Sequence, residues 1–226
     1  MLIGVLLTEE IGYNMTIEEF TKRNPYVYHL TDRDNYNHII NSKRFLSTKD
    51  ILESAEIDNS NHFLRNKRWE HTIIKVGNIN YKIRDQQPIS EIVLARSLTH
   101  NWSKEDFIFH LNSRVFFWPN LNRLQRHFDR YEDEQPIIFR FNSSDILNLH
   151  PEAEFCRLNS GATRCSSHWG GNAPERGPAT FVTAANYPLS PSTVAELTVP
   201  NFSHLPSTFW TSNSPNGPWM PVELLD

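Results

Sequence analysis

Short stretches with the hydrophobic periodicity of strands and short stretches with that of helices follow one another along the chain without a regular order. This feature constrains the fold most strongly. Strand-like runs rich in β-branched and aromatic residues occur at Tyr26–Leu30, Arg114–Trp118, Pro136–Phe141 and Thr193–Val199. Helical patterns are expected at Asp34–Arg44, near Thr48, from Ser103 onward, and along Leu121, Leu124, Phe128 and Tyr131. Gly77-Asn78 predicts a hairpin of Thr72–Val76 and Ile79–Ile83. The order fits neither a regular βαβ fold nor an all-β fold, so it predicts an α+β fold.

The length of 226 residues favours one domain. We expect residues 1–25 to form an N-terminal extension with a first helix, and residues 26–206 to form the main domain. Residues 207–226 are expected to wrap over the same domain, because the last 27 residues contain five prolines and favour irregular structure over a helix. Residues 159–178 contain four of the eight glycines and predict a long loop.

Charge and cysteine content limit the classes of partner and compartment. The net charge of −4 argues against a protein that coats nucleic acid by bulk charge. Basic residues nevertheless gather in 65–84 and 114–130, which predicts either a local basic face or two ordinary solvated faces. The chain has two cysteines, which indicates a reducing, cytoplasmic environment. The apolar run at the N-terminus is too short for a signal peptide or a membrane span, so no membrane association is expected.

Glu196 is the first candidate for chemistry. Alternation along Thr193–Val199 places Ala195, Leu197 and Val199 on one face of a strand. Glu196 then points to the other side, toward whatever lies there. A solvent-facing glutamate on a half-exposed sheet is the commoner outcome for such a strand, because charged residues are mostly exposed. Both interpretations stay open from the strand alone.

His29 and Arg84 are the next candidates. His29 ends a strand just before Thr31 and the start of a helix, where hydrogen-bond donors gather. It could equally be satisfied by local backbone groups. Arg84 follows a strand, and its planar guanidinium suits bidentate contacts to a diphosphate or ribose. A surface ion pair with Asp85 is the alternative.

Metal and common nucleotide-binding motifs are not expected. Cys156, Cys165 and His168 have a C-x8-C-x2-H spacing, which matches no common zinc pattern, so we predict no metal. The chain contains no GxGxxG, Walker loop, HExxH or GxSxG motif. The most frequent dinucleotide-binding and hydrolase interpretations are therefore excluded.

Taken together, several segments resemble the DarT-like ADP-ribosyltransferases, toxins that act on nucleic acid. Tyr26–Thr48 (YVYHLTDRDNYNHIINSKRFLST) is similar to the family's opening, in which a His-x-Thr and a following Asn bind NAD. On this likeness His29, Thr31 and Asn35 bind the cofactor. Lys82–Gln86 (KIRDQ) resembles the region of the NAD-contacting arginine, which is Arg84 here.

The later segments extend the resemblance. Arg114–Pro119 (RVFFWP) is similar to the strand that packs beside the nicotinamide, which assigns Phe116, Phe117 and Trp118 to cofactor binding. Arg157–Cys165 (RLNSGATRC) resembles a family loop with an Asn before small residues. Val194–Pro206 is similar to the last strand, which bears the catalytic glutamate. Trp118 stands where the family has Phe, and the glycine-rich loop 160–178 differs from the family's helical scaffold. A sister group of small standalone proteins with the same HLTDR, RDQ and FFWP segments is the closer description.

The resemblance implies an ADP-ribosyltransferase-like split-sheet core and NAD as co-substrate. Glu196 and Arg84 would carry the catalysis, and an acceptor base would be held by Asn159, Arg164 and Trp169. A nucleic acid acceptor and an antitoxin protein are the implied partners. Three alternatives stay open: an NAD glycohydrolase that uses the same residues, a catalytically inactive protein that binds a nucleotide or a partner, and a nucleic-acid-binding module that does not depend on NAD.

Overall fold

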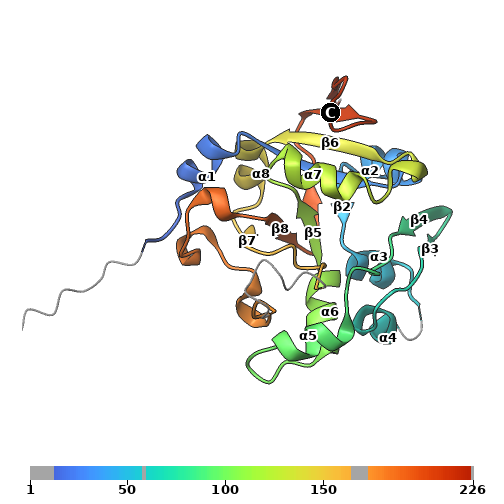
Figure 1. Cartoon of the computed structure of the whole chain (residues 1–226). Coiled ribbons are helices and arrows are strands. Elements are labelled where there is room, and N and C mark those ends of the chain that lie inside the picture. Colours follow the sequence, from blue (N-terminus) through green and yellow to red (C-terminus); the bar gives the residue numbers. More distant parts are fainter. Residues whose placement is uncertain (1–12, 58–59, 164–172, 225–226) are drawn as a thin grey trace, which may run out of the picture.

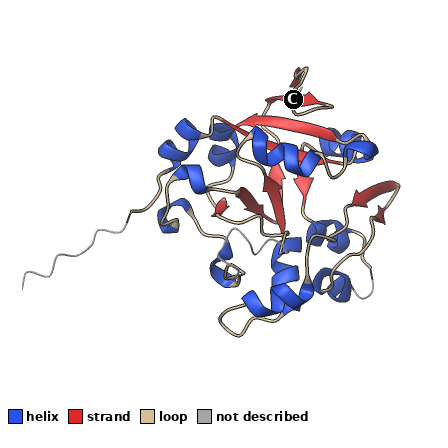
Figure 2. Ribbon diagram, viewed as in Figure 1, coloured by secondary structure: helices blue, strands red, loops and turns tan. Residues whose placement is uncertain are grey.

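The computed structural model describes residues 13–57, 60–163 and 173–224 (Figure 1). The α-helices are short: α1 (Ile17–Arg23), α2 (Tyr36–Ser42), α3 (Thr48–Ser54), α4 (Ser60–Arg65), α5 (Glu91–Ser97), α6 (Lys104–Asn112), α7 (Leu121–Phe128) and α8 (Ser143–Leu149). The 3-10 helices are η1 (Arg33–Asn35), η2 (Glu132–Glu134), η4 (Pro178–Thr180), η5 (Ala184–Asn186) and η6 (Pro191–Thr193). The strands are β1 (Tyr26–Thr31), β2 (Arg44–Leu46), β3 (Thr72–Val76), β4 (Ile79–Ile83), β5 (Arg114–Phe117), β6 (Ile137–Asn142), β7 (Glu154–Cys156), β8 (Glu196–Pro200), β9 (Phe202–His204), β10 (Thr208–Ser212) and β11 (Met220–Glu223). The predicted α+β class is confirmed (Figure 2).

Two antiparallel sheets form the centre of the fold. The first has the strand order β1-β6-β10-β11, and the second has the order β5-β8-β7. The sheets meet where Tyr28 of β1 and Trp118, directly after β5, exchange two backbone hydrogen bonds of 2.9 and 2.7 Å. This junction places the end of β1 beside β5, so residues far apart in the sequence come together there.

Local sequence signals fix several elements where they were predicted. Ser103 caps α6: its Oγ accepts a hydrogen bond from the Asp106 N–H, and the Asp106 carboxylate accepts one from the Ser103 N–H. The hairpin β3–β4 spans the predicted residues. Gly77 in its turn has φ +59°, a conformation that glycine adopts without steric cost. The hairpin projects at the right of Figure 1.

Four clusters of buried apolar side chains hold the elements in place. The largest combines residues of both sheets, including Phe139, Phe141 and Phe155, and each such ring contributes roughly 1.5–3 kcal/mol by burial. The second cluster lies around α5 and α6, and the third packs α7 against β1 and β6. The fourth joins α3, α4 and the hairpin β3–β4. The fold thus has one main core between the two sheets and three smaller clusters around it.

Three expectations about the elements were wrong. The helix expected at Asp34–Arg44 is shorter: η1 and α2 occupy Arg33–Ser42, and Lys43 ends the helix in a left-handed conformation before β2. The strand expected at Thr193–Val199 begins only at Glu196, because η6 precedes it. The irregular wrap expected near the C-terminus contains β9, β10 and β11 instead, and β10 extends the first sheet by pairing with β6. Among the helices that the structure describes, none has the length and apolar content to cross a membrane.

Candidate functional site

A cleft of about 530 Å³ is lined by residues of β1, β4, β5, α6, α7 and β8 and by the turn after β7. This volume lies in the range of about 300–1,000 Å³ that is usual for small-molecule sites. The cleft brings together eight residues that the sequence predicted for NAD or acceptor binding: His29, Thr31, Asn35, Arg84, Phe116, Trp118, Asn159 and Glu196. Phe117 does not line it, because its ring is fully buried in the core between Phe45 and Phe141. Arg164 and Trp169 lie outside the described residues.

Glu196 is buried at the start of β8. The solvent-facing interpretation was wrong: Glu196 is 2% exposed, because both faces of β8 are covered. Glu196 Oε1 accepts a hydrogen bond of 3.1 Å from the Ser160 N–H. Glu196 Oε2 is buried and has no hydrogen-bond partner in the described part of the chain. Burial raises the pKa of Glu196 to about 7, so its carboxyl group titrates near neutral pH.

Three residues that sequence analysis missed surround Glu196. Ser160 anchors its carboxylate from the Asn-Ser-Gly turn, in which only Asn159 was singled out. The charges of Arg123 and Arg176 oppose the burial-driven rise of the Glu196 pKa. Arg176 is itself buried and donates hydrogen bonds to the carbonyl oxygens of Pro174 and Ala162. No sequence motif marks these arginines, because the loops and α7 bring them near Glu196 only in the fold.

His29 is a neutral hydrogen-bonding group in this cleft. Its Nδ1 lies 2.8 Å from the carbonyl oxygen of Phe116, so Nδ1 carries the proton and donates. Desolvation lowers the pKa of His29 to about 4, and Nε2 is therefore an acceptor at neutral pH. The partner is thus the backbone of β5, 87 residues away in the sequence, and not the local backbone that one of the two sequence interpretations expected, while the ring lines the cleft.

Asn35 acts as a bracket between β1 and β4. Its Oδ1 accepts a hydrogen bond from the Lys82 N–H, and its Nδ2 donates to the Lys82 carbonyl, both at 2.9 Å. Nδ2 also lies 3.2 Å from Thr31 Oγ1. The carboxamide therefore imitates one rung of a β-ladder. Although Asn35 lines the cleft, its amide groups are engaged in holding the strand that leads to Arg84.

Arg84 directly follows β4 and is mostly buried. Its Nη1 donates to Glu134 Oε2 at 2.9 Å, and its Cζ lies 4.0 Å from the ring centroid of Tyr131. The surface pair with Asp85 is not formed; Asp85 lies instead against His71 and Arg130. Nε and Nη2 of Arg84 are buried without a partner among the described residues. Sequence analysis missed Glu134 and Tyr131, which flank the guanidinium.

Trp118 and His127 form an aromatic wall of the cleft. The Trp118 ring lies 4.9 Å from the His127 ring and is almost fully buried, so it offers no exposed stacking face. Desolvation, and then the charges of Arg84 and His29, lower the pKa of His127 to about 3. His127 is therefore neutral at physiological pH. Phe116 also lines the cleft, and its ring lies 6.0 Å from the ring of Phe181.

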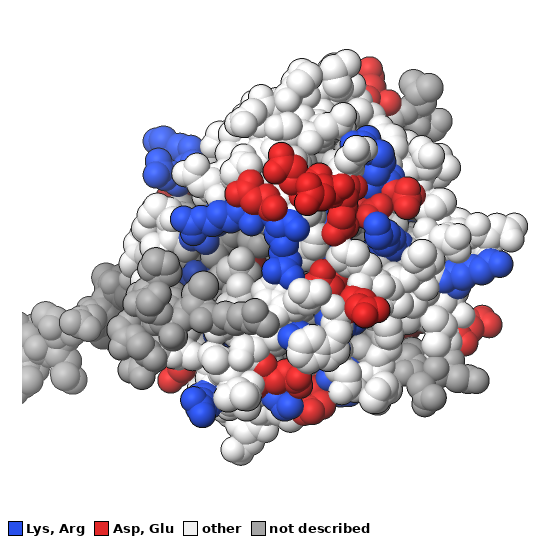
Figure 3. Space-filling view, turned by 45° about the vertical axis from the view of Figure 1, so that its right-hand side comes forward, with Lys and Arg blue, Asp and Glu red and all other residues white. Residues whose placement is uncertain are grey.

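Half of the ten lysines and arginines in the basic stretches 65–84 and 114–130 form ion pairs. Five cations of these stretches lie within 4.0 Å of a carboxylate: Arg65 with Asp106, Lys82 with Asp32, Arg84 with Glu134, Arg114 with Glu154, and Arg130 with Asp85. Figure 3 shows acidic side chains gathered directly above a row of basic ones on one face. This face is thus mixed in charge rather than uniformly basic.

The described residues contain no group of three or more His, Cys, Asp or Glu side chains placed to hold a metal. Cys165 and His168, which the sequence offered as ligands, lie outside the described residues. Cys156 pairs with Glu196 across β7 and β8. Burial, and then the Glu196 charge, raise the pKa of the Cys156 thiol, so this cysteine is protonated at neutral pH.

A family model matches residues 25–207 of the chain. The chain belongs to DUF7002, a family of unknown function. The matched range contains every described residue that lines the cleft, from His29 to Glu196. No curated protein and no solved structure matches the chain.

Proposed function

We propose that this DUF7002 chain is an ADP-ribosyltransferase that binds NAD⁺ in the cleft and transfers ADP-ribose to a macromolecular acceptor. One observation carries the proposal: a single cleft is lined by a buried carboxylate with a free oxygen, Glu196, and by a guanidinium with one free edge, Arg84. Buried polar atoms without a partner are uncommon in proteins and suit a site that a ligand completes. The sequence resemblance assigns the same two residues to NAD chemistry.

In this proposal Arg84 binds the diphosphate. The Nε–H and Nη2–H groups lie on the same edge of the guanidinium, and this edge suits two oxygens of one phosphate. The neutral His29 accepts a hydrogen bond from a ribose hydroxyl through Nε2. Asn35 contributes indirectly, because it holds β4 and hence Arg84 against the end of β1.

Glu196 acts on the nicotinamide ribose. Its ionised carboxylate accepts a hydrogen bond from a ribose hydroxyl and stabilises positive charge on the ribose as the glycosidic bond breaks. Nicotinamide leaves with the bonding electron pair. A nucleophilic atom of the acceptor then bonds to the anomeric carbon and loses its proton to solvent. The cationic nicotinamide riboside of the bound NAD⁺ favours the ionised form of Glu196.

A nucleic acid base is the acceptor that we favour. Arg126 lines the cleft and is exposed, so it is placed to contact a phosphate of a strand. Asn159, exposed at the turn beside Ser160, offers an amide to the edge of an unstacked base. In the cytoplasm such an activity would be toxic, and we propose that an antitoxin protein restrains it.

The test follows nicotinamide release and label transfer from NAD⁺ labelled in its adenylate part. We expect the wild-type protein to release nicotinamide and to label single-stranded DNA or RNA, with little release when no nucleic acid is present. Release without labelling would support an NAD glycohydrolase instead. Salt-sensitive nucleic acid binding with no release would support a binding module and contradict the transferase.

A further inference from the structure

We propose that Glu134 is a positioning residue, which fixes the guanidinium of Arg84 for anion binding in the cleft. This inference rests on the proposed NAD⁺ site and adds a residue that neither the sequence motifs nor the family match assigns. Glu134 lies in η2, on a turn that follows α7, and it does not itself line the cleft. Among the residues that line the cleft, Arg84 donates a hydrogen bond to the Glu134 side chain, and Lys82 Nζ lies 3.9 Å from Glu134 Oε2.

The guanidinium of Arg84 is held at one edge by a hydrogen bond and at one face by an aromatic ring. Glu134 Oε2 accepts from Arg84 Nη1 at 2.9 Å, and the Tyr131 ring lies beneath the guanidinium, 4.0 Å from Cζ. These two contacts define both the plane and the rotation of the group. The edge formed by Nε and Nη2 remains without a partner. An arginine held in this way has lost its side-chain freedom before a ligand arrives, so binding costs less entropy.

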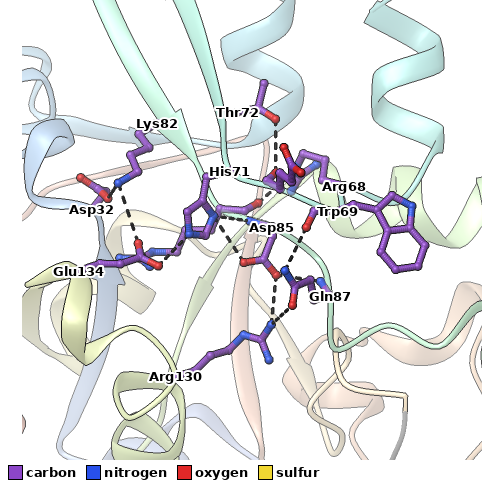
Figure 4. Close-up of polar contacts among 12 residues, drawn as sticks. Asp32, Arg68, Trp69, His71, Thr72, Lys82, Asp85, Gln87, Arg130 and Glu134 are labelled. Atoms are coloured by element: carbon purple, nitrogen blue, oxygen red, sulfur yellow. Dashed lines mark hydrogen bonds and ion pairs between the residues drawn. The ribbon is translucent and has the colours of Figure 1, made fainter.

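Glu134 is in turn held by His71. The Asp85 N–H donates to His71 Nδ1 at 3.0 Å, so the proton of the imidazole lies on Nε2. His71 Nε2 then donates to Glu134 Oε1 at 2.8 Å. Each carboxylate oxygen of Glu134 therefore receives one donor. Figure 4 shows the carboxylate of Glu134 facing His71 on one side and Lys82 on the other, with Asp85 beyond His71.

This pattern requires a carboxylate rather than an amide. Glutamine offers one acceptor and one donor, but both His71 Nε2 and Arg84 Nη1 are donors. A Glu134→Gln variant thus keeps the shape of the side chain and loses one of the two hydrogen bonds. Loss of this hydrogen bond is expected to weaken anion binding, because Arg84 is held less firmly. If Glu134 acted only through its charge, the variant would instead bind anions more tightly, because a negative charge near the cleft is removed. The sign of the change therefore separates positioning from charge.

The experiment compares Glu134→Gln with Glu132→Gln, an identical change at an exposed position of the same turn. We expect the dissociation constant of ADP-ribose, measured by titration calorimetry, to rise about tenfold or more for Glu134→Gln, as is typical when a partner that orients a binding residue is lost. Glu132→Gln should bind like the wild type. Thermal melts of all three proteins control for folding. Unchanged or tighter binding by folded Glu134→Gln would overturn the inference.

A second readout does not depend on the ligand. In the wild type we expect the Arg84 Nε–H to give one sharp NMR signal, identified by its loss in Arg84→Lys. In Glu134→Gln this signal should shift and broaden because the guanidinium is released. An unchanged signal would overturn the inference. If the wild type fails to bind ADP-ribose, the proposed NAD⁺ site fails, while this signal still decides whether Glu134 holds Arg84.

Discussion

Glu196→Gln is expected to lower the rate of nicotinamide release from NAD⁺ by about 10²–10³-fold and to weaken NAD⁺ binding far less. The glutamine side chain keeps the size of Glu196 and an oxygen that can accept from the Ser160 N–H. It lacks the negative charge that stabilises the ribose cation, which develops only as the glycosidic bond breaks. Single-turnover release measures the rate, and calorimetry measures the affinity.

Glu18→Gln is the matched control for this prediction. Glu18 is exposed on α1 and does not line the cleft, so the same chemical change there should leave the rate unaltered. A folded Glu196→Gln protein that releases nicotinamide as fast as the wild type would remove Glu196 from the chemistry. The cleft would then need another source of negative charge, and among the described residues that line it the only other acid is Asp85.

Glu196→Gln is also expected to gain stability relative to the wild type as the pH rises, by about 2–3 kcal/mol between pH 5 and pH 8. Burial raises the pKa of Glu196 from 4.5 to about 7. Between these two values the unfolded chain ionises and the folded protein stays protonated, so the free energy of unfolding of the wild type falls with increasing pH. The fall ends once the folded carboxyl ionises above pH 7. Glutamine does not titrate, so the variant lacks this loss.

Urea unfolding of both proteins across this pH range measures the difference. For Glu18→Gln, the difference in free energy of unfolding from the wild type should not change with pH. The raised pKa of Glu196 would be contradicted if the difference in free energy of unfolding between Glu196→Gln and the wild type stayed constant from pH 5 to pH 8. The absence of a partner for Glu196 Oε2 would then be contradicted as well. A buried ionised carboxylate with an unpaired oxygen destabilises the fold. This loss of stability is typical of a binding site in which a cationic ligand pairs with the carboxylate.

The elements best predicted from sequence are those that depend on local signals. The hairpin β3–β4 follows from Gly77-Asn78, and α6 follows from the cap at Ser103. The C-terminal strands were missed because their prolines favour loops, although Thr208–Ser212 (TFWTS) has the β-branched and aromatic residues of a strand. Its pairing with β6 is a long-range contact that no local pattern contains.

The candidate site was predicted in part. The strand ends and turns that carry His29, Arg84 and Glu196 were singled out from residue type and position. The burial of Glu196 could not be derived from alternation, because alternation assumes one exposed face, and β8 has a neighbour on each side and cover on both faces. Ser160 and Glu134 contact these side chains across 36 and 50 residues of sequence. Only the assembled fold identifies such partners.

The most direct test of the proposed NAD⁺ site is a calorimetric titration of NAD⁺ into the wild type, Arg84→Lys and Arg96→Lys. Lysine at position 84 keeps the charge that faces Glu134 but removes the paired N–H edge. Arg96 is exposed on α5 and does not line the cleft, so its variant is the matched control. We predict saturable binding to the wild type and Arg96→Lys, and binding about 10–100-fold weaker to Arg84→Lys. No binding to the wild type, or equal binding to all three proteins, would contradict the account.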